Sequence, residues 1–293
     1  MDFFSSLIAP FSEYSFMKRA MAACLILSLS GTPLGVFITL RRMTLVGDAV
    51  SHAVLPGIAV AFFLFGFAVL PMAVGGIFAG VIIAMLAILL VRFSSLKTDT
   101  ALAVIYLSSL AVGVVLISLG GTSVDLSHFL IGDILAVDDT SLILISFTAI
   151  ITVFAIAVFY RAFIIQSFDD GFSVFNSPSN SKKIFSVFQK SITVEMIFYV
   201  LLIINLISAF FVFGTLMGLG IILLPAITAR CLSNDIDNIL PLSVMIAIAS
   251  SVIGLEISYH FAVPSGACIV LIAGISCFFA VFYEILSNKR NVS

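Results

Sequence analysis

Residues 196–229, MIFYVLLIINLISAFFVFGTLMGLGIILLPAITA, are 34 consecutive uncharged residues between Glu195 and Arg230. About 20 apolar residues are enough for one α-helix to cross the hydrocarbon core of a bilayer. The run is therefore too long for one ordinary membrane span and short for two. Its second half favours a break or close helix contacts, because it holds Gly214, Gly218, Gly220 and Pro225.

The same membrane character extends along the whole chain. Of the 293 residues, 62% are hydrophobic and 10% are charged, and the mean hydropathy is +1.30. These values lie far outside those of ordinary soluble domains. Because hydrocarbon offers no water to the backbone, such a chain crosses it as helices, and the short alternating segments of a β-barrel are absent from the sequence. We predict an all-α polytopic membrane protein in which residues 1–293 form one domain.

The uncharged runs predict nine spans, with eight as the alternative. The predicted ranges are 20–40, 44–66, 69–91, 101–119, 141–160, 196–214, 215–229, 241–261 and 264–287. Short cytoplasmic loops collect Lys and Arg, so the positions of these residues favour one count over the other. Nine spans with the N-terminus outside put 11 basic residues in the cytoplasm and 2 outside, whereas eight spans give 8 and 5. We therefore expect nine spans, an extracytoplasmic loop at 120–140, a cytoplasmic loop at 161–193 and a cytoplasmic C-terminus.

Asp48 and His52 are the most informative polar residues, because they open one of the apolar runs. Four residues apart, they share one face of a helix. Ionisable groups are costly inside hydrocarbon and usually face a partner or a water-filled path. A carboxylate and an imidazole suit borderline divalent cations such as zinc, manganese and iron. Two alternatives stay open: Asp48 caps a helix near Arg41 and Arg42, or the pair relays protons.

Two further groups of acidic and imidazole residues are weaker candidates for metal contacts. Glu256 and His260 repeat the four-residue spacing near the outer end of the eighth predicted span. There, simple solvation explains the pair as well as metal handling does. Asp125, His128 and Asp133 fall in the extracytoplasmic loop, where a merely acidic loop is the stronger interpretation.

Nothing in the sequence indicates an enzyme. The chain has no G-x-x-x-x-G-K-[ST] loop to hold nucleotide phosphates and no complete H-E-x-x-H metalloprotease helix. The cysteines lie in or beside apolar runs without C-x-x-C spacing, so we interpret them as packing residues; they are Cys24, Cys231, Cys268 and Cys277. We expect a non-enzymatic membrane subunit with no permanently bound cofactor.

Several blocks of the chain resemble the ABC-3 family, the permease subunits of bacterial zinc, manganese and iron importers. The most specific block is LRRMTLVGDAVSHAVLPG at residues 40–57. Supporting blocks are FLIGDILAV at 129–137, LLPAITAR at 223–230, and Ser258-Tyr259 followed by PSGA at 264–267. The resemblance covers nearly the whole chain.

The resemblance implies the architecture of a type II ABC importer permease in a bacterial inner or plasma membrane. Two permease copies would form the path, two separate ATPase subunits would bind below it, and an extracytoplasmic binding protein would deliver the metal. In that family the Asp and His of the second span contact the ion; here they are Asp48 and His52. The coupling helices that dock on the ATPase would begin at Ser167, Phe168 and Asp169.

The chain departs from the family pattern in two places. Ser173-Val174-Phe175-Asn176 stands where an Ala-x-x-x-Gly pattern usually follows the coupling Phe-Asp, and an acidic residue frequent before the Pro-Ser-Gly block is missing. The coupling helices therefore differ in detail or in their ATPase partner. The main alternative function is a secondary transporter that uses Asp48 and His52 as a proton relay. A membrane scaffold without transport is a more distant one, because it gives no reason for intramembrane acid–imidazole pairs.

Overall fold

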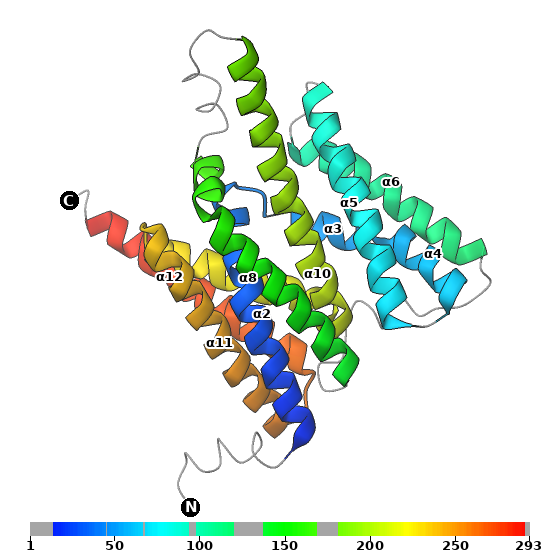
Figure 1. Ribbon diagram of the computed structural model, residues 1–293. Coiled ribbons are helices and arrows are strands. Elements are labelled where there is room, and N and C mark those ends of the chain that lie inside the picture. Colours follow the sequence, from blue (N-terminus) through cyan, green and yellow to red (C-terminus); the bar gives the residue numbers. More distant parts are fainter. Residues whose placement is uncertain are drawn as a thin grey trace, which may run out of the picture. The chain divides into compact units, whose positions relative to one another are not determined.

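The computed structural model describes residues 14–44, 46–66, 68–93, 98–119, 137–168 and 181–290 (Figure 1). The helices are α2 (Ser15–Leu40), α3 (Val46–Ala53), α4 (Leu55–Phe65), α5 (Val69–Phe93), α6 (Thr98–Leu119), α8 (Asp139–Phe168), α10 (Ser181–Leu232), α11 (Ile236–Phe261) and α12 (Ser265–Arg290). Within this part of the chain, eight helical segments are long and apolar enough to cross a membrane, with α3 and α4 counted together. The predicted all-α polytopic membrane fold is confirmed.

The chain divides into two compact units. Unit 1 comprises residues 1–39, 123–150 and 205–293, and unit 2 comprises residues 40–122 and 151–204. Within unit 1, α11 packs along α12. Within unit 2, α4, α5 and α6 lie side by side, and α3 packs against α6 (Figure 1). Helices α8 and α10 each run from one unit into the other. That the whole chain forms a single domain stays a prediction.

The long uncharged run lies in α10, which folds back on itself at Gly214. This glycine has φ 79° and ψ 166°, a left-handed conformation that side chains rarely adopt. A Cβ built on Gly218 would lie 3.1 Å from the Cβ of Ala209, whereas nine residues of straight helix span about 13.5 Å. The chain therefore reverses between them, and the apolar span Thr193–Leu232 has two legs. The predicted division between residues 214 and 215 falls at this break, so eight and nine spans differ by this one element.

The predicted cytoplasmic loop at 161–193 is more helical than expected. α8 continues through Arg161 to Phe168, and α10 begins at Ser181. No proline or glycine stands between Arg161 and Phe168 to end the helix. The first charged residue marks the end of the apolar run and not the end of the helix. Residues 169–180 lie outside the described part.

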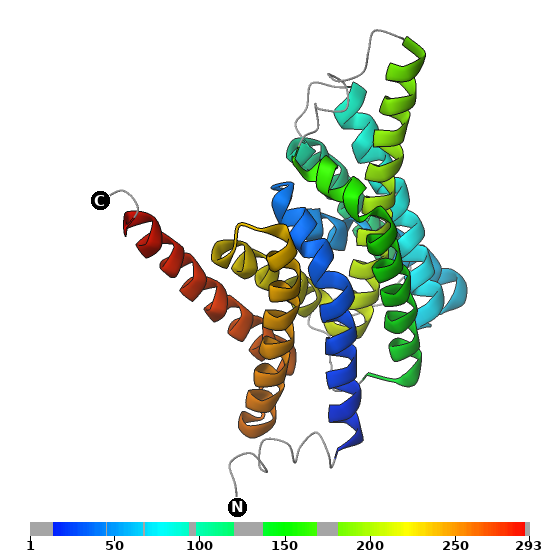
Figure 2. The ribbon, with the colours of Figure 1, turned by 60° about the vertical axis from the view of Figure 1, so that its left-hand side comes forward.

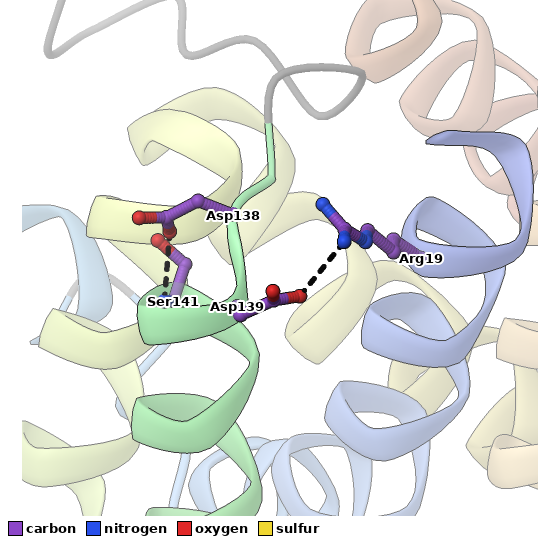
Figure 3. A network of polar contacts seen from close by, with 4 residues as sticks. All are labelled: Arg19, Asp138, Asp139 and Ser141. Atoms are coloured by element: carbon purple, nitrogen blue, oxygen red, sulfur yellow. Dashed lines mark hydrogen bonds and ion pairs between the residues drawn. The ribbon is translucent and has the colours of Figure 1, made fainter. Parts of the chain in front are cut away.

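The start of α8 lies beside the N-terminal end of α2 in unit 1 (Figure 3). Nη2 of Arg19 is 3.0 Å from Oδ1 of Asp139. The N–H of Ser141 donates to Oδ1 of Asp138 at 2.8 Å, so Asp138 caps α8. Hydrogen bonds from the Ser141 hydroxyl and amide lower the pKa of Asp138. These two helix ends share one side of unit 1, as the predicted topology requires of the N-terminus and the 120–140 loop.

The second half of α12 exposes large apolar side chains. They are Phe278, Phe279, Phe282, Tyr283 and Leu286, each at least half exposed. Figure 2 shows this half diverging from α11. Such a surface suits lipid, whose tails are as apolar as the side chains.

Candidate functional site

The predicted Asp48–His52 pair lies on α3, an eight-residue helix of unit 2, with Asp48 in the first turn and His52 in the last. Nε2 of His52 is 3.9 Å from Oδ1 of Asp48, so the four-residue spacing does place both side chains on one face. The Asp48 side chain is 67% exposed and the His52 side chain 32%. The capping alternative is wrong in position, because Asp48 stands two residues after Val46, the first residue of the helix. A carboxylate in a first turn still interacts favourably with the helix dipole.

The helix ends directly after the pair because Pro56 interrupts it. Proline has no N–H, so the carbonyl of His52 receives no hydrogen bond from four residues ahead. The N–H of Gly57 donates to the carbonyl of Val54, three residues back, at 3.1 Å. α3 and α4 are therefore two helical segments within the single span Val46–Phe65.

Helix α6 supplies the neighbours of the pair. The ring centroids of Tyr106 and His52 are 6.4 Å apart. The hydroxyl of Ser109 donates to the carbonyl of Ala53 at 2.7 Å. Neither residue was predicted from the sequence, since each lies some 50 positions from the pair. The available signal was weak: both are polar residues in an apolar span, which tend to face protein and not lipid.

The pair supplies only part of a metal site. Zinc takes about four ligands and manganese or ferrous iron takes more, whereas one carboxylate and one imidazole give two side chains. Within the described residues, no group of three or more His, Cys, Asp or Glu side chains is placed to hold a metal. The remaining ligands would have to come from water, from a second chain or from residues outside that part.

The second predicted pair lies near the end of α11 in unit 1. Nε2 of His260 is 3.8 Å from Oε2 of Glu256. The Glu256 side chain is only 8% exposed, and the His260 side chain is 53% exposed. Within the part of the chain that the structure describes, neither carboxylate oxygen of Glu256 makes a hydrogen bond. The helix ends just beyond, where Ala262 has φ 50° and the Ser258 hydroxyl donates to the carbonyl of Val263.

Ser167, predicted to begin the coupling segment, forms a hydrogen bond with Arg41, which lies between α2 and α3. Its hydroxyl donates to the carbonyl of Phe163 at 2.7 Å and accepts from Nε of Arg41 at 3.4 Å. Arg41 also donates to Oε1 of Gln166 at 3.3 Å, and its guanidinium carbon lies 3.9 Å from the centroid of the Phe198 ring. Within unit 2, Arg41 thus connects the chain leading into α3 with the end of α8 and with Phe198 of α10.

Several predicted site residues cannot be placed. Asp125, His128, Asp133 and Asp169 lie outside the described residues, and for Phe168 only the backbone is described. The two acid–imidazole pairs belong to different units, Asp48 and His52 to unit 2 and Glu256 and His260 to unit 1.

Known proteins are similar to this sequence over nearly its full length. Residues 13–284 match the model of the ABC 3 transport family. The chain is 32% identical to the manganese transport system membrane protein MntC of Listeria monocytogenes, with 96% of each chain covered. It is 30% identical to the manganese import system permease protein ScaB of Streptococcus parasanguinis, covering 95% of this chain and 93% of that protein. It is 28% identical to the chelated iron transport system membrane protein YfeD of Yersinia pestis, covering 97% and 91%.

A solved structure shares the fold. A chain of PsaBC from Streptococcus pneumoniae in complex with Fab matches with a TM-score of 0.75 and 30% identity, covering 94% of this chain and 95% of that chain. The sequence match and the structural match agree in extent. The predicted family is confirmed: the chain belongs to the ABC 3 transport family.

Proposed function

We propose that this protein moves a divalent transition metal through the membrane and that Asp48 and His52 contact the metal on its way. As a member of the ABC 3 transport family, the chain is a multi-pass membrane permease subunit of an ABC metal importer. It works with a separate ATPase subunit and an extracytoplasmic binding protein. ATP hydrolysis is assigned to the ATPase subunit, since this sequence lacks a phosphate-binding G-x-x-x-x-G-K-[ST] loop.

The exposure of Asp48 supports this proposal most directly. Its carboxylate is 67% exposed although it belongs to the apolar span Val46–Phe65. An acidic side chain facing lipid tails costs about 2.5 to 3.5 kcal/mol on insertion scales at the centre of a transmembrane helix, and more in other estimates. Asp48 lies in the first turn of its span. This cost favours an arrangement in which the face that carries Asp48 and His52 borders water or another protein chain and not lipid tails. A path at the interface of two permease copies satisfies both conditions.

We assign Glu256 and His260 a second, weaker contact with the metal. A buried carboxylate without a hydrogen bond in the described residues is costly unless a cation or proton joins it. His260 presents its exposed imidazole beside that carboxylate. Simple solvation explains His260 but not the buried Glu256. Metal contacts by Asp125, His128 and Asp133 stay predictions.

The donor types and the relatives together restrict the metal. Carboxylate oxygen and imidazole nitrogen bind zinc, manganese and ferrous iron, and affinity order alone favours zinc. The named relatives transport manganese or chelated iron, so manganese and iron are the first candidates and zinc is the third. The metal is cargo, and we expect no resident cofactor. The orientation, with the N-terminus outside and the C-terminus in the cytoplasm, rests on the charge bias.

Uptake by a reconstituted complex tests the role of the pair. Vesicles containing the permease and its ATPase subunit would be supplied with binding protein and radiolabelled manganese, iron or zinc. We expect Asp48→Asn and His52→Ala to lower uptake at least about 100-fold while the complex still assembles. The matched control is Asp139→Asn, which removes an exposed charge paired with Arg19 in unit 1. Normal uptake by both pair variants would overturn the assignment.

The same vesicles separate the importer from a proton-coupled transporter. Uptake by the importer requires ATP inside the vesicles and stops when the ATPase subunit is omitted. A secondary transporter would instead lose uptake when a protonophore dissipates the proton gradient, with or without ATP.

A further inference from the structure

The break between α3 and α4 is bridged by a side chain from a third helix. In a continuous helix the carbonyl of Ala53 would accept from the N–H of Gly57, but that N–H donates to Val54. The hydroxyl of Ser109 on α6 takes its place, at 2.7 Å from the Ala53 oxygen. Within a membrane an unsatisfied carbonyl is costly. By donating to the Ala53 carbonyl, Ser109 therefore stabilises the break between α3 and α4.

One face of α6 packs along the span from His52 to the break between α3 and α4. Tyr106, Ser109 and Gly113 are spaced three and four residues apart and share a face. Tyr106 lies beside the His52 ring. At Gly113 the helices are so close that an added Cβ would lie 3.0 Å from the Cβ of Leu55. α6 thus holds both segments, and Ser109 marks the point where they meet.

We propose that Ser109 is a positioning residue for Asp48 and His52. His52 is adjacent to Ala53, and Asp48 lies one turn further back on the same short helix. Pro56 separates α3 from α4, and the hydrogen bond from Ser109 holds the Ala53 carbonyl at this break. This bond fixes the orientation of α3, and with it the face formed by Asp48 and His52. The inference rests on the proposed function, because a role in positioning presupposes that the pair meets the metal.

Substitutions at two adjacent serines provide the test. Ser108 also lies on α6, but its hydroxyl is exposed and donates within its own helix to Val104 at 2.8 Å. We expect Ser109→Ala to raise the manganese concentration for half-maximal uptake about tenfold, with a smaller change in maximal rate. Ser108→Ala should leave both unchanged. Ser109→Thr retains a hydroxyl and should restore most of the affinity, whereas Ser109→Cys, a weak donor, should restore little.

Pro56→Ala adds a sharper test through a double-mutant cycle. The new N–H can bond the His52 carbonyl, and a continuous helix lets Gly57 bond Ala53. In that background the Ala53 carbonyl no longer needs Ser109. Adding Ser109→Ala to Pro56→Ala should therefore cause little further change, and the two effects should be strongly non-additive. Full additivity would contradict the positioning role.

The outcomes distinguish this inference from the proposed function. If Asp48→Asn is inactive but Ser109→Ala has the half-saturation of Ser108→Ala, only the positioning role is overturned. The positioning role is also overturned if Ser109→Ala lowers complex yield and maximal rate at unchanged half-saturation, since that describes packing alone. Normal uptake by Asp48→Asn and His52→Ala overturns the proposed function itself.

Discussion

The two acid–imidazole pairs have the same spacing and almost the same separation, but their burial is reversed. His52 and Asp48 are 3.9 Å apart, and His260 and Glu256 are 3.8 Å apart. In the first pair the acid is 67% exposed and the imidazole 32%; in the second the acid is 8% exposed and the imidazole 53%. Spacing along a helix sets only which side chains are neighbours. The surrounding helices determine which member of each pair meets solvent, a path or a partner.

The local backbone differs as well. The first pair occupies a short helix that a proline ends and a neighbouring serine stabilises. The second lies near the end of α11, a 26-residue helix. Under the proposed function, an exposed acid on a short segment suits a contact that exchanges the metal. A buried acid on a long helix is held in place, which suits a fixed contact better than a moving one.

The largest expected difference concerns transport. Asp48→Asn removes the exposed carboxylate of the first pair, and we expect uptake to fall at least about 100-fold. Glu256→Gln keeps the shape of the second acid but not its charge, and we expect roughly a tenfold loss. Both would be measured as initial uptake rates per assembled complex. A greater loss for Glu256→Gln than for Asp48→Asn would reverse the assignment of primary and secondary contact.

The second prediction concerns Arg41, which precedes the first pair in the chain and contacts Ser167 of the predicted coupling segment. Arg41→Lys keeps the charge but loses the planar guanidinium that contacts Ser167, Gln166 and Phe198. We expect uptake to fall about tenfold while ATP hydrolysis falls less, so that more ATP is consumed per metal ion. Arg42→Lys is the control, since Arg42 is exposed. Equal losses of uptake and hydrolysis would show that Arg41 does not link the two.

The sequence was sufficient to predict the class of fold and the proximity of the two side chains in each acid–imidazole pair. Hydropathy and helical spacing are local properties of the chain. The apolar runs identified the spans, and the break at Gly214 fell where glycines made the long run ambiguous. The end of α8 was missed because the charge of Arg161 ends an apolar run without ending the helix. Local patterns mark where the chain leaves hydrocarbon, which need not be where its helix stops.

The reversed burial of the two pairs could not be predicted from the sequence, because burial depends on tertiary packing. Nothing within four residues of Glu256 indicates that its carboxylate is buried and that of Asp48 is not. Likewise, Ser109 and Tyr106 come from another helix. Only packing brings them to α3, so no spacing rule could have connected them to the pair.

The third prediction uses stability to test the difference in burial. Glu256→Leu replaces a buried carboxylate that lacks a hydrogen bond in the described residues with an apolar group of similar size. We expect the free energy of unfolding to rise by about 1 to 3 kcal/mol. Asp48→Leu changes an exposed side chain and should alter it by less than about 0.5 kcal/mol. Unfolding of the purified permease in detergent measures both, and destabilisation by Glu256→Leu would show that the carboxylate has a structural partner.

The smallest expected effect comes from Asp138, an acid whose partners lie within its own chain. Its carboxylate caps α8 through Ser141, and those hydrogen bonds lower its pKa. Asp138→Asn retains an acceptor oxygen, so it should cost only a few tenths of a kcal/mol at this exposed position and leave uptake unchanged.

Because the folded pKa of Asp138 is lowered, the advantage of the carboxylate is present above the ordinary Asp pKa of about 3.9 and is lost as pH falls through the lowered value. Unfolding at pH 7 should therefore separate the native protein from this variant slightly, and unfolding near pH 2 should not. A large uptake defect in Asp138→Asn would mean that loss of any acid impairs the permease, and the contrast between Asp48 and Glu256 would then say nothing about a metal path.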